Sequence, residues 1–127
     1  MTQEEKDLLL KDLCARLPYN PLISINGERY RMEEIRNALI GINKYKITVD
    51  GYDIEYMNIK PYLFPLSSMT EEHQKEMSSF DPFQTEETKT LGQWAFHLVD
   101  FYNKHHFDYR GLIEKGLALD ATELNIY

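Results

Sequence analysis

Residues 60–72 read Lys-Pro-Tyr-Leu-Phe-Pro-Leu-Ser-Ser-Met-Thr-Glu-Glu, and this stretch separates two parts of the chain that differ in hydrophobic pattern. Pro61 and Pro65 lack an amide donor and fix their own φ, and each keeps the preceding residue out of the helical region. The segment is therefore extended and stiff, although residues 62–64 are large and apolar. Because large apolar side chains are usually buried, we predict that this segment crosses the core.

The hydrophobic period is 2 before this segment and 3.6 after it, which indicates strands followed by helices. We predict one α+β domain over residues 1–127, with a helix over 1–17, a β half over 21–66 and a helical half over 67–127. The β half is expected to be a small curled antiparallel sheet made of two hairpins, which could close toward a barrel. The C-terminal helices are expected to pack on that sheet.

Composition indicates a small soluble protein that works in the cytoplasm. A chain of 127 residues with 43% apolar and 28% charged residues suits one globular domain. The longest apolar runs are three residues, so no membrane span is predicted, and the acidic N-terminus does not resemble a secretory signal. The single cysteine, Cys14, agrees with a reducing compartment and is expected to be a buried apolar residue.

Charge is uneven along the chain. Residues 1–66 carry nine basic and ten acidic side chains, whereas residues 67–127 carry five basic and eleven acidic ones. The acidic helical half would repel a phosphate backbone, which disfavours nucleic-acid binding there. The nearly neutral β half leaves nucleic-acid binding open.

The N-terminal helix has a clear start and stop. Thr2 and Glu5 match a capping box, and Pro18 ends the helix. Its apolar stripe is expected to be Leu10, Leu13, Cys14 and Leu17, with Lys6, Asp7, Lys11 and Asp12 mostly on other faces.

Two hairpins are predicted where Asx-Gly pairs interrupt alternating strands. Residues 23–27 read Ile-Ser-Ile-Asn-Gly, and residues 47–51 read Ile-Thr-Val-Asp-Gly. Such pairs are typical of the two-residue type I′ turn, in which both central residues have positive φ. Between the hairpins, residues 33–43 suit either a short helix or a strand. We favour a strand, because it would join the two hairpins into one sheet.

In the helical half, Thr70 is expected to cap a helix that ends near Ser79, followed by a polar loop over residues 80–90. A long amphipathic helix is predicted from apolar residues at helical spacing: Leu91, Trp94, Ala95, Leu98, Phe101, Tyr102 and His105. Asp108 is expected to cap one more short helix, which ends at Gly116.

One cluster could carry chemistry: His97, Asp100, His105, His106 and Asp108. A histidine beside a carboxylate can bind a metal or act as a base, which would make the chain a metal-assisted hydrolase. We favour structural roles instead, with His105 in the apolar stripe and His106 as a cation at the helix end. We therefore assign no catalytic residue, no metal and no cofactor.

Five residues of the β half are predicted to form a binding surface: Arg29, Arg31, Lys44, Lys46 and Tyr52. Alternation places Arg29 and Arg31 opposite Tyr30 and Met32, so the arginines are exposed if the other face is core. Arginine is common at binding hot spots, and tyrosines beside basic residues can stack on nucleic-acid bases. Solubilising charge and cross-strand packing are the plainer interpretations of these residues.

Three blocks of the sequence carry a family resemblance. The first is residues 60–72, quoted above. The second is residues 8–19, Leu-Leu-Leu-Lys-Asp-Leu-Cys-Ala-Arg-Leu-Pro-Tyr, and the third is residues 105–119, His-His-Phe-Asp-Tyr-Arg-Gly-Leu-Ile-Glu-Lys-Gly-Leu-Ala-Leu. They resemble a family of small uncharacterised proteins from gut Bacteroidetes and their prophages or mobile elements. The resemblance implies a cytoplasmic role linked to a phage or mobile element, without an activity. It also implies that the more variable residues 21–58 carry specificity.

The function that we favour is a non-enzymatic accessory or regulatory module that binds another macromolecule. An unidentified protein is the expected partner, and nucleic acid bound by the β half is the alternative. A membrane is not an expected partner, and the oligomeric state stays open.

Overall fold

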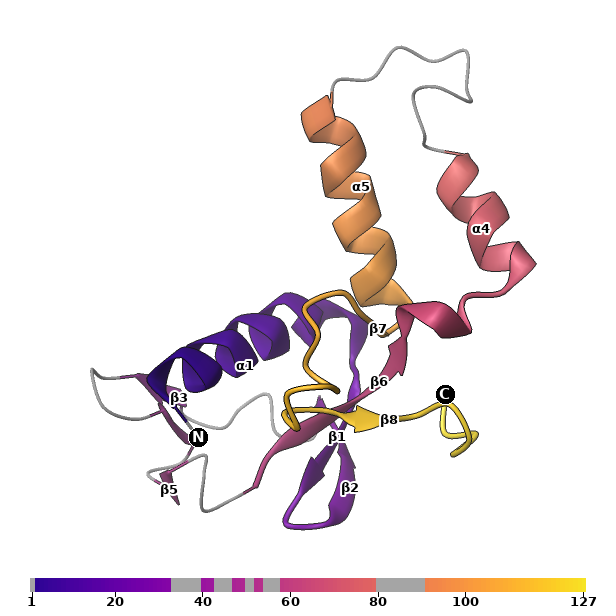
Figure 1. Cartoon of the computed structure of the whole chain (residues 1–127). Helices are drawn as coiled ribbons and strands as arrows, with labels where there is room; N and C mark the ends of the chain where they lie inside the picture. Colours follow the sequence, from indigo (N-terminus) through magenta and orange to yellow (C-terminus); the bar gives the residue numbers. More distant parts are fainter. Residues whose placement is uncertain (1, 33–39, 43–46, 50–51, 54–57, 80–90) are drawn as a thin grey trace.

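The computed structural model of the chain describes residues 2–32, 40–42, 47–49, 52–53, 58–79 and 91–127. Its helices are α1 (Gln3–Arg16), α4 (Glu71–Ser78) and α5 (Leu91–Lys104), with short 3-10 helices at Leu17–Tyr19 and Leu66–Ser68. Its strands are β1 (Leu22–Ile25), β2 (Glu28–Arg31), β3 (Ile40–Ile42), β4 (Ile47–Val49), β5 (Tyr52–Asp53), β6 (Lys60–Pro65), β7 (Phe107–Asp108) and β8 (Leu119–Asp120). The predicted α+β fold class is confirmed (Figure 1).

Strand β6 is the central strand of the larger sheet, which confirms that the proline-containing segment crosses the core. It pairs antiparallel with β1 and parallel with both β7 and β8. Its backbone groups reach residues far along the chain, because the Phe64 amide donates to the His106 carbonyl and the Leu63 carbonyl accepts from the Ala121 amide, both at 2.8 Å. The prolines remove donors only at their own positions, so the intervening residues still form these bonds.

The sheet differs from the prediction in two respects. It is mixed and not purely antiparallel, because the C-terminal segments β7 and β8 run parallel to β6. It is also not closed into a barrel: the described strands form a five-stranded sheet and a separate three-stranded sheet of β3, β4 and β5. Within the described residues, the two hairpins therefore belong to separate sheets.

Both hairpins are confirmed as pairs of antiparallel strands. In the first, Ile25 pairs with Glu28, and the turn residues Asn26 and Gly27 have φ of 52° and 85°, as a type I′ turn requires. In the second, Val49 pairs with Tyr52. The Asp-Gly turn at 50–51 and the predicted loop at 80–90 lie outside the described residues. Of the segment 33–43, which suited either a helix or a strand, residues 40–42 form a strand. Residues 33–39 and 43 lie outside the described residues.

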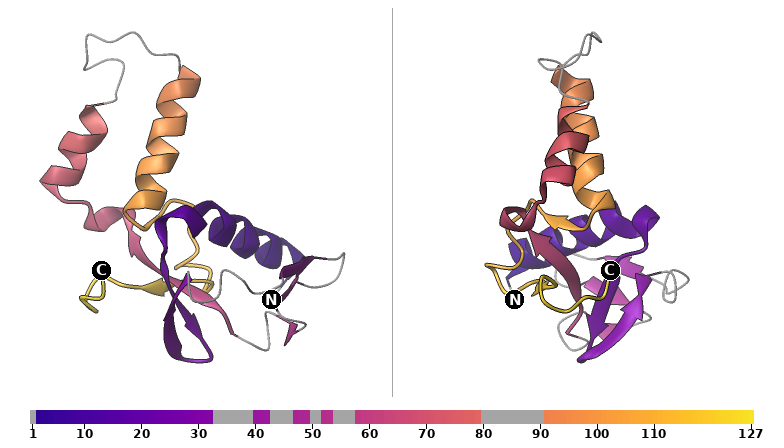
Figure 2. Two further views of the ribbon diagram at one scale, coloured as in Figure 1. Left: turned by 180° about the vertical axis from the view of Figure 1, so that it is seen from behind. Right: turned by 90° about the vertical axis from the view of Figure 1, so that its right-hand side faces the viewer.

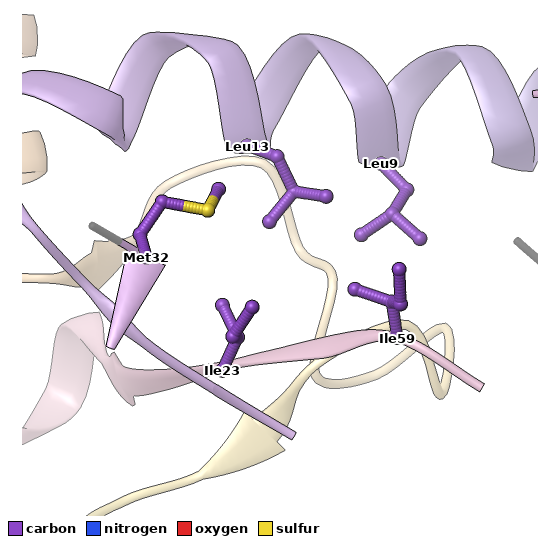
Figure 3. Packing of buried hydrophobic residues seen from close by; sticks show 5 residues of the cluster. All are labelled: Leu9, Leu13, Ile23, Met32 and Ile59. Carbon is purple, nitrogen blue, oxygen red and sulfur yellow. The ribbon is translucent and has the colours of Figure 1, made fainter. Parts of the chain in front are cut away.

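Helix α1 covers one face of the larger sheet and encloses an apolar cluster (Figure 3). Its capping box forms as predicted, with the Glu5 amide donating to Thr2 Oγ1 and the Thr2 amide donating to Glu5. Its buried stripe differs from the prediction, because Leu17 and Cys14 are exposed. The cluster is formed by Leu9, Leu13, Ile23, Met32 and Ile59.

A buried ion network explains why the stripe prediction was wrong. Asp12 and Arg16 are fully buried on α1 and bond each other at 2.8 Å. Asp12 also accepts from Arg110 at 2.8 Å, and Arg16 donates to the Phe107 carbonyl at 2.5 Å. Buried charges need such partners, and these partners come from residues about ninety positions away, so the sequence pattern alone could not show them.

The rest of the core lies around β6. Leu63 is buried with Leu112, Leu117 and Ala118. On the neighbouring strand positions, Tyr62 is buried with Leu22 and Ala121, and Phe64, Leu119 and Ile126 pack against this group. Alternate residues of β6 therefore contribute to different apolar clusters, as the pleat of a strand requires.

The segment after β7 forms a turn where the sequence predicted a short helix. The Asp108 carboxylate accepts from the amides of Leu112 and Ile113 at 2.9 Å, so its predicted capping role is kept. The Leu117 amide bonds the Leu112 carbonyl, and Gly116 has φ of 73°, which is the Schellman geometry of a helix end. The chain turns away there before a regular helix forms.

Helices α4 and α5 project away from the sheet, as both views in Figure 2 show. We call this pair of helices the arm. Helix α4 begins with Thr70 as its N-cap, as predicted. Helix α5 ends at the body of the protein, where Phe101 is 3% exposed. The last turn of α5 is therefore anchored in the core, whereas the earlier turns extend outward.

We expect Leu63→Ala to lower the free energy of unfolding by about 2–5 kcal/mol, because Leu63 is fully buried on the central strand. Chemical denaturation measures this loss. The matched control is Leu66→Ala in the same segment, because Leu66 is 41% exposed and should cost less than about 1 kcal/mol. Equal effects of the two substitutions would contradict the central role of β6.

Candidate functional site

The structure separates the residues of the cluster that the sequence singled out. His97 is exposed on the arm. Asp100 accepts a hydrogen bond from the Tyr19 hydroxyl. His105 bonds Glu76 of α4. Asp108 is buried, and its carboxylate accepts hydrogen bonds from two backbone amides. These residues therefore serve different contacts and do not converge on one point.

The described residues hold no group of three or more His, Cys, Asp or Glu side chains arranged to bind a metal ion. Metal-assisted hydrolysis by the cluster thus has no geometric support there. That the protein binds no metal stays a prediction.

A pocket of about 390 Å³ lies where α4, the end of α5 and the C-terminal segment meet β6. It combines three histidines, a lysine, three hydroxyl residues and three aromatic rings. None of the described residues that line it is acidic, although the chain carries 21 Asp and Glu. The lining residues are Phe64, Ser68, Thr70, His73, Lys104, His105, His106, Phe107, Thr122 and Tyr127.

His73 enters the pocket from the first turn of α4 in a defined tautomer. Its Nδ1 accepts a hydrogen bond from the Thr70 amide at 3.1 Å, while its own amide donates to Thr70 Oγ1. This is a capping box with histidine in the place of the usual Glu or Gln. Because a backbone amide can only donate, Nδ1 must be the bare nitrogen and Nε2 carries the hydrogen.

Lys104 and His105 reach the pocket from the end of α5, and both bond Glu76, which is not a lining residue. The Glu76 carboxylate lies 2.5 Å from His105 Nε2 and 3.3 Å from Lys104 Nζ. Partial burial alone would raise the pKa of Glu76, but the hydrogen bonds from His105 and Lys104 outweigh it and lower this pKa. Glu76 therefore stays ionised and holds the base of the arm together.

His106 forms the inner wall of the pocket in a conformation that few residues other than glycine adopt. Its φ is 60°, and its ring stacks on Tyr127 with 3.9 Å between the ring centroids. Its Nδ1 is buried without a hydrogen-bond partner. Burial first, and then the charges of Arg16, His105 and Arg31, lower the pKa of His106 to about 4.

The prediction that His106 acts as a cation at the helix end is therefore wrong. An imidazole with a pKa of about 4 is neutral at pH 7. The reason is tertiary: the C-terminal residue covers this ring, and no local sequence signal places Tyr127 there.

Tyr127 connects the pocket to the sheet. Its hydroxyl accepts from the Leu22 amide of β1 at 2.7 Å and donates to the Tyr62 carbonyl of β6 at 2.9 Å. Burial raises the pKa of this phenol to about 12. The C-terminal side chain thus bridges two strands while its ring forms one wall of the pocket.

The predicted binding surface of the β half is described only in part. Arg29 and Arg31 are exposed and Met32 is buried, so the predicted alternation is confirmed. The Arg29 guanidinium lies 5.4 Å from the centroid of the Tyr62 ring, a cation–π geometry. Lys44 and Lys46 lie outside the described residues, and the side chain of Tyr52 is also outside. The structure therefore does not test this surface as a whole.

Sequence reasoning missed His73, Glu76 and Tyr127. A signal existed for the first two, because Thr70 and His73 have capping-box spacing and Glu76 lies one turn further on the same predicted helix. Nothing comparable pointed to Tyr127, whose contacts span 65 residues and more along the chain.

A scan against protein-family models, a search of curated proteins and a search of solved structures gave no match. Among the helices of the described residues, none has the length and apolar character needed to cross a membrane.

We expect His106→Asn to make the fold less sensitive to acid. The folded state holds the pKa of His106 near 4, below its ordinary value of 6.5. Between these values the unfolded chain binds a proton that the folded chain does not, so stability falls as the pH drops, by up to roughly 3 kcal/mol. Asparagine tolerates positive φ and does not titrate, so it should remove this component.

Guanidinium denaturation at pH 7 and at pH 4 measures the effect. The control is His97→Asn, which makes the same substitution at an exposed position of α5 outside the pocket. An unchanged pH dependence in His106→Asn would show that His106 titrates normally in the folded protein.

For metal binding, we expect flat calorimetric titrations with zinc, manganese and nickel, because His105 is engaged by Glu76 and His97 lies apart from it. Stoichiometric micromolar binding that is abolished in His97→Ala would reverse this expectation and support the hydrolase hypothesis.

Proposed function

We propose that this chain is a non-enzymatic accessory or regulatory module that binds another protein through its projecting arm. The observation that carries the proposal is the exposure of large apolar side chains on α5, where Phe96 is 69% and Val99 is 41% exposed. Single exposed apolar residues are common, but these two lie together on one helix that extends from the body. Figure 1 shows α5 extending away from the sheet.

The exposed residues form a second apolar face of α5. Gly92, Ala95, Phe96 and Val99 are spaced at i, i+3, i+4 and i+7, so they share one side of the helix, and all four are exposed. The first apolar face consists of Trp94, Leu98 and Phe101, which are half-buried or buried. A helix of a globular protein normally needs only one apolar face, so the second face is available to a partner.

The chemistry of this face defines the partner. It carries no charged residue, while the chain as a whole has a net charge of −7. An apolar helix or loop of another protein would bury it without opposing charge, whereas nucleic acid would gain nothing from it. We therefore propose a protein partner with an exposed apolar segment, in a cytoplasmic setting linked to a phage or mobile element.

The basic surface at Arg29 and Arg31 is the competing location for the same function. Arginine is frequent in binding hot spots, and both side chains are exposed. The arm is preferred because the exposed face of α5 that carries Phe96 and Val99 is apolar, and covering this face with a partner would be favourable at any ionic strength.

Phe96→Ser combined with Val99→Ser should leave the fold intact and abolish partner capture. Exposed substitutions usually change stability by less than about 0.5 kcal/mol, whereas loss of a binding hot spot weakens affinity by about thirtyfold or more. Capture from a lysate of the native host, with mass spectrometry and then an affinity measurement on the recovered protein, tests this. The matched control is Leu124→Ser, because Leu124 is 44% exposed on the C-terminal segment.

Two results would contradict the arm as the binding surface. One is a partner that the arm variant captures as well as the wild type does. The other is a partner that is lost only in Arg29→Ser combined with Arg31→Ser, which would place the site on the β half. Recovery of nucleic acid in place of protein would favour the nucleic-acid alternative.

A further inference from the structure

We propose that the pocket between α4, the end of α5 and the C-terminal segment binds a small organic anion, an aromatic ring that carries a phosphate or carboxylate group. The proposal is independent of the partner-binding face of α5, because neither Phe96 nor Val99 lines the pocket. It rests on three features of the pocket: its charge, its available donors and its aromatic walls.

The described side chains that line the pocket are basic or uncharged, whereas the protein as a whole is acidic. Acidic residues outnumber basic ones by 21 to 14 in the chain, yet the described lining residues include Lys104 and three histidines and no acidic side chain. Two neighbouring carboxylates bond lining side chains: Glu76 bonds Lys104 and His105, and Asp120 accepts from the Thr122 hydroxyl. An anion placed beside Lys104 would therefore gain a cationic partner, although the protein as a whole is negative.

Among the described side chains that line the pocket, His73 and Lys104 offer donors to a ligand. His73 must carry its hydrogen on Nε2, since Nδ1 accepts from the Thr70 amide. Lys104 has three N–H donors, its bond to Glu76 uses one, and its side chain is 54% exposed. By contrast, the Ser68 and Thr122 hydroxyls already donate to the Pro65 carbonyl and to Asp120, so they are poorly placed to bind an anion.

Aromatic rings make up the remaining walls. Phe64 and Tyr127 lie with their centroids 5.5 Å apart, His106 stacks on Tyr127 at 3.9 Å, and His73 meets Phe107 edge-on at 5.0 Å. A planar ligand would find both faces and edges of rings here. The volume of about 390 Å³ lies within the range of small-molecule sites, and it exceeds what a bare inorganic anion needs.

His106 contributes its ring and not its Nδ1 to the pocket, because Nδ1 is buried. Buried polar atoms are hydrogen-bonded in the large majority of cases, and this nitrogen has no partner. Because His106 is neutral at pH 7, it cannot attract the anion by charge. It contributes to the pocket only through its ring, which stacks on Tyr127.

The experiment is a calorimetric titration of the full chain at pH 7 with four probes: phenyl phosphate, benzoate, inorganic phosphate and benzyl alcohol. Phenyl phosphate or benzoate should bind at least about tenfold more tightly than benzyl alcohol, which lacks the charge, because charge-assisted hydrogen bonds are the stronger class. Either should also bind more tightly than inorganic phosphate, which lacks the ring. Which of the two binds better identifies the anionic group.

Lys104→Gln should weaken binding of the better probe by about tenfold or more, since it removes the only cationic donor with spare capacity among the described lining residues. The matched control is Lys75→Gln, which removes the same charge from an exposed position of α4 outside the pocket and should leave affinity unchanged. Nuclear magnetic resonance shifts at His73 Nε2 on titration provide a readout at the site itself.

Each contrary result would overturn the proposal. No binding of either aromatic anion would remove the site. If benzyl alcohol bound as tightly as the aromatic anions, the pocket would not select for negative charge. If inorganic phosphate bound as tightly as phenyl phosphate, the pocket would not select for an aromatic ring. Equal weakening in Lys104→Gln and Lys75→Gln would indicate long-range charge and not a pocket contact.

Discussion

The fold depends on the pairing of one strand, β6, with three other segments. Two prolines stiffen this strand, and it still offers backbone groups to β1, β7 and β8. The partners come from both ends of the chain, so closing this sheet brings residues near position 23 together with residues near 107 and 120. The buried network of Asp12, Arg16 and Arg110 connects the same two ends of the chain, because Arg16 also bonds the carbonyl of Phe107 in β7.

The pocket and the position of the arm depend on this pairing of β6 with both ends of the chain. In the turn from α5 into β7, His105 contacts Glu76 and His106 contacts Tyr127, so these neighbouring histidines have different partners. His105 is paired with a carboxylate, while burial and nearby positive charge hold His106 neutral. A binding surface on the arm and a polar pocket at its base would give the protein two separate contacts, one for a macromolecule and one for a small anion.

Much of the fold followed from local rules. The capping boxes at Thr2 and Thr70, the type I′ turn at Asn26, and the periodicity of α5 each depend on residues within a few positions of one another. The predictions that failed depended on distant partners. Cys14 and Leu17 were expected in the core, but the ion pair of Asp12 and Arg16 occupies the buried side of α1 together with Leu9 and Leu13. The candidate site was predicted only in part, since His105 was noted while His73, Glu76 and Tyr127 were not.

The sequence by itself determined the fold class, most of the element boundaries and the crossing of the core by the proline-containing strand, because turn, cap and periodicity signals act over short distances. Only the tertiary structure decided which strands pair with β6, which side of α1 is buried and which side chains line the pocket. The physical reason is that charge burial and strand pairing depend on partners far away in the chain. A histidine such as His106 has no fixed charge state until Tyr127 and its other neighbours have closed around it.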